Sequence, residues 1–128
     1  MKPGWALLLF CAAFLDVRAG DAEPSSLTAV LTLRKPDASP ECFDQSGIQA
    51  AVEARLGRAV FVGESSADVR LELTFSVQPG GGWRAELMLS SRGGRFLGSR
   101  ELSTRAEHCS ALDDSLALVV ALLLDIPR

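Results

Sequence analysis

Hydrophobic and polar residues alternate strictly along two neighbouring runs in the middle of the chain, residues 69–77 and 83–90. This period of two is typical of strands that bury one face and expose the other to water. The segment 78–82 between them (QPGGG) has the composition of a turn. Pairing Val77 with Trp83 puts the apolar residues of both runs on one face. A shift of one residue would turn them all to solvent, so the pattern predicts a hairpin in this single register.

The next segment, residues 96–104, alternates poorly, because two bulky apolar residues are adjacent at its start and Gly98 interrupts it. We predict an outer strand with a bulge at Gly98, whose charged residues Arg100 and Glu101 protect an exposed edge. The preceding segment 92–95 (RGGR) looks like an arginine-glycine box for RNA. A single copy in an acidic chain is more typical of a turn.

A first helix is predicted before the hairpin, because apolar residues recur there with helical spacing. It begins at Glu41, with Ser39 as its N-cap, or later at Gln45, with Asp44 or Ser46 as the capping residue. It ends at Leu56, where a glycine follows as the C-cap.

A second helix is predicted from Cys109 to Ile126. Ser110 and Asp113 have the spacing of a capping box, and Pro127 ends the run. This helix is apolar nearly all round, which predicts that it is the most buried helix of the domain. A membrane anchor at this place is disfavoured, because the apolar stretch is far shorter than a bilayer requires.

Two more strands, residues 27–33 and the short run 60–62, complete the order β-α-β-β-β-β-α. This order predicts an α+β two-layer sandwich, in which an antiparallel sheet of four or five strands carries two helices on one face. The domain is expected to occupy residues 27–128, after a flexible lead-in at residues 20–26.

Residues 1–19 have the anatomy of a signal peptide. Lys2 supplies the positive start, an uncharged apolar run follows, and small residues at Val17 and Ala19 predict cleavage after Ala19. The alternatives are an uncleaved anchor, for which the run is shorter than the ~20 residues that a bilayer needs, and a lipoprotein. A lipoprotein is disfavoured because Phe10 precedes Cys11, where lipid-attachment signals take a small residue.

Cleavage would leave Cys42 and Cys109, each just ahead of a predicted helix. In an oxidising compartment the default for such a pair is a structural disulfide. Free, reactive or metal-bound thiols are the alternative. Zinc would need four ligands, which the two cysteines, His108 and an aspartate could supply only without the disulfide.

Other candidate chemistries are weak, and we predict no catalytic residue, cofactor or metal site. The single histidine, His108, adjoins Cys109, and sequence neighbours rarely converge as a nucleophile and its base. Asp113 and Asp114 point about 100° apart on a helix and suit its positive end. The glycines at 80–82 lie between strands and not before a helix, where phosphate loops need them.

Composition agrees with a globular domain. Hydrophobic residues make up 48% of the chain, and 13 basic against 16 acidic residues leave a formal net charge of −3. A nucleic-acid binder would be expected to carry a strongly basic surface, so this class is excluded. The polar face of the hairpin is either solvent-facing sheet or a candidate partner-binding face, and its residues include Arg70, Glu72, Thr74, Arg84, Glu86 and Met88.

Several segments together resemble a domain of uncharacterised exported proteins from myxobacteria and similar high-GC bacteria. The likeness covers about residues 27–128 and rests on Cys42, 52–58 (VEARLGR) with Phe61, the alternating hairpin, 98–102 (GSREL), and 109–113 (CSALD) with 116–118 and Asp125. The resemblance implies an exported module, often followed by further sequence, and no activity. In topology alone the order is similar to small periplasmic domains such as the N-terminal domain of TolB.

Taken together, the sequence predicts a periplasmic or secreted, non-enzymatic module that binds a protein partner of the cell envelope. It predicts no nucleic-acid partner and no stable membrane span after cleavage. The exposed edge at residues 92–104 is a second candidate surface, because an open strand can accept an added one. The alternative function is a small hydrolase or a thiol redox protein that uses Cys42 and Cys109.

Overall fold

The structure is a computed structural model that describes residues 27–36 and 42–125. The predicted signal peptide, the lead-in and the earlier helix start at Ser39 to Glu41 lie outside these residues, as do Ile126 and Pro127. The described elements are β1 (Ala29–Arg34), α1 (Gln45–Leu56), β2 (Val69–Val77), β3 (Trp83–Ser91), β4 (Phe96–Thr104) and α2 (Asp113–Leu124).

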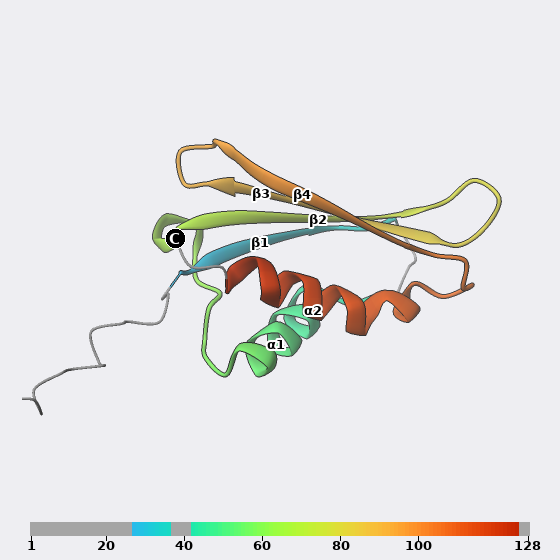
Figure 1. Cartoon of the computed structure of the whole chain (residues 1–128), viewed down its shortest axis with the longest axis horizontal. Coiled ribbons are helices and arrows are strands. Elements are labelled where there is room, and N and C mark those ends of the chain that lie inside the picture. Colours follow the sequence, from blue (N-terminus) through green and yellow to red (C-terminus); the bar gives the residue numbers. More distant parts are fainter. Residues whose placement is uncertain (1–26, 37–41, 126–128) are drawn as a thin grey trace, which may run out of the picture.

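The fold is α+β, as predicted. Four strands form one sheet in the order β1-β2-β3-β4, and both helices pack on the same face of it (Figure 1). The order of elements along the chain also matches the prediction. The short strand expected at residues 60–62 is present as a single bridge between Phe61 and Ala29.

The sheet is mixed, whereas a fully antiparallel sheet was expected. β1 runs parallel to β2, with Ala29 opposite Val69 and Leu33 opposite Leu73. The reason lies in the connection, because α1 carries the chain back along the sheet between the two strands. A strand that follows such a crossover enters the sheet in the same direction as the one before it.

The hairpin register predicted from the two alternating runs is confirmed. Val77 pairs with Trp83, and the antiparallel pairing continues without a shift to Val69 and Ser91. Alternate residues of β2 and β3 are therefore buried under the helices, and the residues between them face outward.

β4 is an outer strand with an irregularity, as expected, but the extra residue is Leu97 rather than Gly98. Leu89 lies opposite Gly98, while the next residue of β3, Ser90, lies opposite Phe96. Leu97 therefore has no partner of its own in β3. Such a bulge bends an edge strand and increases its twist.

Helix α1 has the start and the end that its sequence indicates. The side chain of Asp44 accepts a hydrogen bond from the backbone N–H of Gly47 (2.7 Å), which confirms the later of the two predicted starts. At the other end Gly57 has a φ of 72°, the left-handed conformation that glycine adopts without a steric penalty.

The predicted capping box of α2 is wrong. Residues 109–112 form a 3₁₀ turn, and the α-helix begins only at Asp113, with no side-chain cap at its start. Ser110 lies inside that turn, where its backbone carbonyl accepts the N–H of Asp113. The spacing of a capping box was present, but the chain starts the α-helix three residues after the predicted capping residue.

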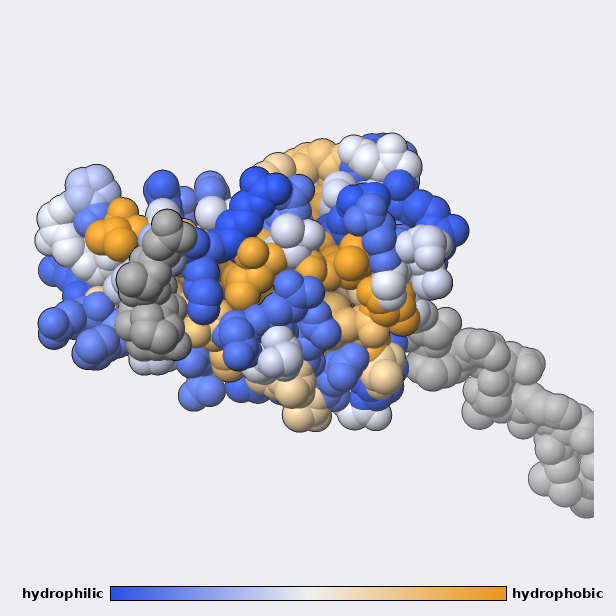
Figure 2. All heavy atoms as spheres, turned by 180° about the vertical axis from the view of Figure 1, so that it is seen from behind, coloured by the Kyte–Doolittle hydropathy of each residue, from blue (hydrophilic) through white to orange (hydrophobic). Residues whose placement is uncertain are grey.

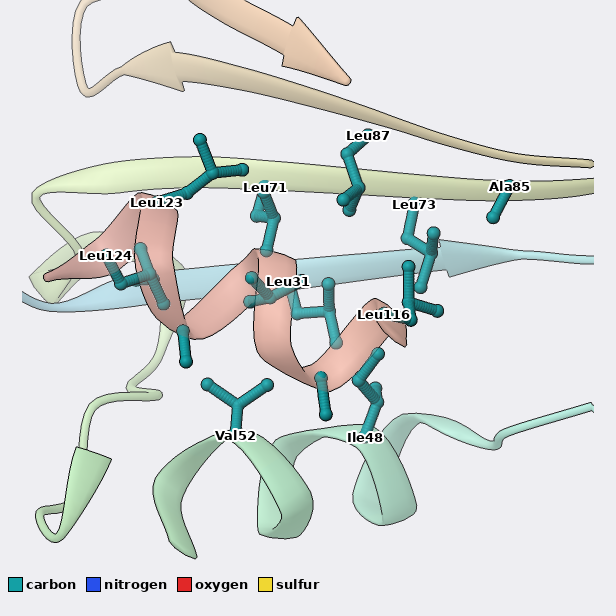
Figure 3. Close-up of a cluster of buried hydrophobic side chains, with 14 of the residues drawn as sticks. Leu31, Ile48, Val52, Leu71, Leu73, Ala85, Leu87, Leu116, Leu123 and Leu124 are labelled. Carbon is teal, nitrogen blue, oxygen red and sulfur yellow. The ribbon is translucent and has the colours of Figure 1, made fainter. Parts of the chain in front are cut away.

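The core lies between the sheet and the helices (Figure 3). α2 contributes six buried residues and α1 contributes two, so α2 is the more buried helix, as its sequence predicted. Side chains from both layers point toward one another, with those of α2 between the sheet and α1. The central ones are Leu31, Leu71, Leu73 and Leu87 from the sheet and Ile48, Val52, Leu116, Leu123 and Leu124 from the helices.

Cys42 and Cys109 form a disulfide, and their α-carbons are 5.2 Å apart. Cys42 lies just before α1, and Cys109 opens the turn that leads into α2. Both residues are buried, with exposures of 4% and 0%. The bond therefore joins the starts of the two helices inside the core, at the positions that the sequence indicated.

Replacing both cysteines by alanine is expected to lower the free energy of unfolding by about 4 kcal/mol, because the bond closes a loop over a sequence separation of 67 residues. Urea unfolding followed by circular dichroism measures this difference. The unmodified protein in reductant serves as a control and should unfold near the double variant. Equal unfolding midpoints with and without the disulfide would contradict this estimate.

Candidate functional site

The two edges of the sheet differ in whether other parts of the chain hydrogen-bond to their outward backbone groups. On β1 the N–H of Ala29 donates to the carbonyl of Val60 (2.9 Å), and its carbonyl accepts from the N–H of Val62 (2.9 Å). Further along, Nε2 of Gln45 donates to the carbonyl of Leu31 (2.9 Å). At Ala29 and at the carbonyl of Leu31 the outer side of β1 is thus covered by the chain itself, which hinders the addition of another strand there.

Glu53 in α1 holds this cover in place. Its Oε2 accepts hydrogen bonds from the backbone N–H groups of Phe61 (3.0 Å) and Val60 (2.8 Å). These two bonds, that of Phe61 foremost, hold the pKa of Glu53 below its ordinary value. The side chain is therefore ionised at neutral pH and joins α1 to the segment that covers β1.

The outer side of β4 has no such cover. Its inner side pairs with β3, and no other segment within residues 27–36 and 42–125 pairs with it. The side chain of Arg100 donates to the carbonyl of Ser99 (2.7 Å), a bond within β4 itself that brings no other segment to this edge. β4 is therefore the open edge of the sheet, the kind of edge that can hydrogen-bond to an added strand.

A groove of about 350 Å³ runs beside this open edge, between β4 and α2, and its exposed lining is mostly apolar. On the helix side, Leu122 is 58% exposed, and Leu118 one turn earlier is 45% exposed. We call this feature the β4 groove, and its lining residues are Arg100, Glu101, Leu102, Val119, Leu122 and Leu123.

The charged residues of β4 lie on opposite faces of the sheet. Arg100 is opposite Leu87, a core residue, so it lies on the face that carries the helices. Glu101 lies on the outward face, where its carboxylate is 3.3 Å from the guanidinium of Arg84. Arg100 forms no ion pair with any described residue. The β4 groove thus has a cation at its rim whose charge is not matched by a neighbouring acid.

The outward face of the sheet holds the six residues that the sequence singled out, and the pairing of β2 with β3 places them side by side. Most of its charges are matched locally. Arg70 pairs with Glu64 (3.0 Å), and Glu72 with Arg34 (3.9 Å), in exposed ion pairs of the kind that stabilise a fold by about 1 kcal/mol or less. The role of this face as a docking surface stays a prediction.

Apolar side chains also reach the surface on this outward face, where Met88 is 48% exposed and Phe96 is 58% exposed. Ser90, the partner of Phe96, is two residues from Met88, so the two side chains are near neighbours beside the open edge. Apolar surface therefore flanks β4 on both faces of the sheet.

Seen from behind the view of Figure 1, the molecule shows mainly hydrophilic side chains with apolar ones in separate groups between them (Figure 2).

The residues considered for nucleophilic or metal chemistry do not form an accessible group in the described structure. The sulfur atoms of Cys42 and Cys109 are bonded to each other in the core, whereas reactive cysteines are typically partly exposed. His108 is exposed beside them. Among residues 27–36 and 42–125, no three His, Cys, Asp or Glu side chains are grouped as metal ligands.

No protein-family model matches this chain, and no curated protein is similar to it in sequence. The resemblance to exported domains of myxobacteria therefore stays a prediction. None of the helices in the described ranges is long and apolar enough to cross a membrane.

Asp113, at the start of α2, is a carboxylate in an unfavourable place. Its Oδ1 is buried and accepts no hydrogen bond from a described residue. Burial, together with the neighbouring charge of Asp114, raises the pKa of Asp113 above its ordinary value. A raised pKa in the folded state means that the neutral acid fits the fold better than the carboxylate does, so ionisation destabilises the protein.

Asp113→Asn is therefore expected to stabilise the protein at pH 7, by less than about 1 kcal/mol because the residue is only partly buried and water screens its charge, which a thermal melt would detect as a rise of a few degrees. The sign follows from the pKa. Below about pH 3.9, the pKa of an aspartate in an unfolded chain, Asp113 is protonated and makes its full contribution to stability. This contribution is lost as the pH rises through the higher pKa that Asp113 has in the folded protein. The gain should accordingly vanish near pH 3.

Asp114→Asn, an exposed change in the same turn, is the matched control and should alter stability by less than about 0.5 kcal/mol. A lower melting temperature of Asp113→Asn at pH 7 would mean instead that the carboxylate stabilises the helix start.

Proposed function

We propose that this protein is a non-enzymatic binding module of the periplasm or the extracellular space, which docks a protein partner of the cell envelope through the open edge at β4. The observation that carries the proposal is the contrast between the two edges of its sheet. β1 is covered at Ala29 by residues 60–62 and at the carbonyl of Leu31 by Gln45, while no described segment pairs with the outer side of β4, which has the β4 groove beside it.

An open edge of this kind provides both affinity and selectivity for an extended segment. The backbone of the added strand hydrogen-bonds to β4, and every second side chain of that strand points toward the β4 groove. Leu122, which is exposed in the groove wall, would lose contact with water when such a strand binds. The partner segment is therefore expected to be extended and to carry apolar residues at alternate positions.

Export is supported by three features that agree with one another. The first 19 residues have the order of charge, apolar run and small residues that signal peptidases recognise. The two remaining cysteines form a disulfide, a bond that persists in oxidising compartments. The resemblance to exported bacterial domains points to the same location.

Selection of short random segments displayed on phage, with the oxidised protein as target, tests the proposal. We expect enrichment of segments with alternating apolar residues. A synthetic copy of an enriched segment should slow backbone amide hydrogen exchange in β4 by at least tenfold, because its strand protects edge amides. Exchange at Ala29 and Leu31 in β1 is the internal control and should stay unchanged. Protection at the outward face of β2 and β3, or no enriched segment, would contradict docking at β4.

A further inference from the structure

We infer that the open edge of β4 recognises an extended segment that presents a carboxylate opposite Arg100, with an apolar residue two positions to either side of it. This inference rests on the proposed strand addition and names the chemistry of the segment. It follows from three features of the β4 groove: the face on which Arg100 lies, the apolar wall provided by α2, and the unmatched charge at its rim.

The face is determined by the pairing of β3 with β4. Leu87 lies opposite Arg100 and Ala85 opposite Leu102, and directly opposite residues share a face. Arg100 and Leu102 therefore both lie on the face with the helices. A strand added to β4 would continue this pattern, so the side chains it places opposite these two residues would also lie on that face.

The helix face of the groove favours apolar residues in the added strand. Val119, Leu122 and Leu123 of α2 form the wall of the groove beyond the edge of the sheet. A valine or leucine of the bound strand would bury its surface against this wall, and so would part of Leu122, which is 58% exposed in the free protein.

The exception is the position opposite Arg100. The guanidinium has no acidic partner among the described residues, and its hydrogen bond to Ser99 goes to a backbone carbonyl. The acid next to it in sequence, Glu101, lies on the other face and is paired with Arg84. A carboxylate in the bound strand could accept two parallel hydrogen bonds from Arg100, the strongest geometry for this pair of groups.

The same pattern disfavours a second copy of this chain as the occupant. If β4 pairs with itself in an antiparallel arrangement, residues of the same type meet at the centre of the register. Registers centred on the middle of the strand bring Arg100 against Arg100 or Glu101 against Glu101, and like charges directly opposite destabilise a sheet. A segment of different sequence, with an acid in place of the arginine, avoids this conflict.

The inference is tested with the end-capped peptide Thr-Val-Thr-Glu-Thr-Val-Thr, which places valine, glutamate and valine on one face whichever way it runs. Versions with glutamine or lysine at the centre are the comparison probes. Fluorescence polarisation with the oxidised full-length mature protein should show at least tenfold tighter binding of the glutamate peptide than of the lysine peptide. The preference should shrink as salt is added, because the pair lies near the surface.

Charge reversal in the protein makes the test specific. Arg100→Glu should invert the order, so that the lysine peptide binds at least tenfold more tightly than the glutamate peptide. Arg55→Glu, an exposed change on α1, is the matched control and should leave the order unchanged. Leu122→Lys, at an exposed position in the groove wall, should weaken all three peptides by at least tenfold. Thermal melts would show that each variant is folded.

The outcomes separate this inference from the proposed function. Equal binding of the three peptides, or an unchanged order in Arg100→Glu, would overturn the role of Arg100 and leave strand addition intact. If none of the three binds while the display selection yields segments that protect β4, the chemistry inferred here is wrong and the docking edge is right. A dimer in solution whose β4 amides exchange more slowly than those of the monomer would show that a second copy covers β4, which also overturns the inference.

Discussion

The disulfide between Cys42 and Cys109 is the constraint on which the rest of this small fold depends. The two helices cover only one face of the sheet, and α1 packs more against α2 than against the sheet (Figure 3). The disulfide joins the starts of both helices and so holds the helix layer together, although the two cysteines are 67 residues apart in sequence. The bond is worth about 4 kcal/mol by loop-closure entropy, a large share of the 5–15 kcal/mol by which domains are typically stable.

The topology built on this constraint treats the two edges of the sheet unequally. The crossover through α1 returns the chain beside β1, so the segment that follows the helix covers that edge, and the carboxylate of Glu53 holds the segment in place. β4 instead leads through a short turn into α2, and no later part of the described chain reaches its outer side. The same helix then provides an apolar wall beside the uncovered strand.

Much of the fold could be predicted from the sequence, because some patterns allow only one pairing of strands or mark the ends of a helix. The register of β2 and β3 was predictable since a single pairing suits both faces, and Asp44 and Gly57 mark the ends of α1 by their local chemistry. The parallel direction of β1 was missed, because alternation along a strand carries no information about its neighbour. The capping box at Ser110 was wrong, since the same spacing is compatible with a 3₁₀ turn.

The candidate site was only partly predictable for a related reason. The edge strand could be recognised from its glycine and its charges, but a groove depends on how far α2 lies from β4, which no local pattern encodes. One signal was present in the sequence: α2 is more apolar than one buried face requires, and its surplus is the exposed pair Leu118 and Leu122. The six outward residues of the hairpin are together as predicted, although their charges are largely matched by neighbours.

The most direct measurement is the state of the two sulfurs in the exported protein. The mature protein would be purified without reductant, alkylated under denaturing conditions, and digested for mass spectrometry of the peptides that contain Cys42 and Cys109. The disulfide seen in the structure predicts one linked peptide pair and no alkylation at either residue. Complete alkylation of both cysteines would show that the helices are not covalently joined and would contradict this account.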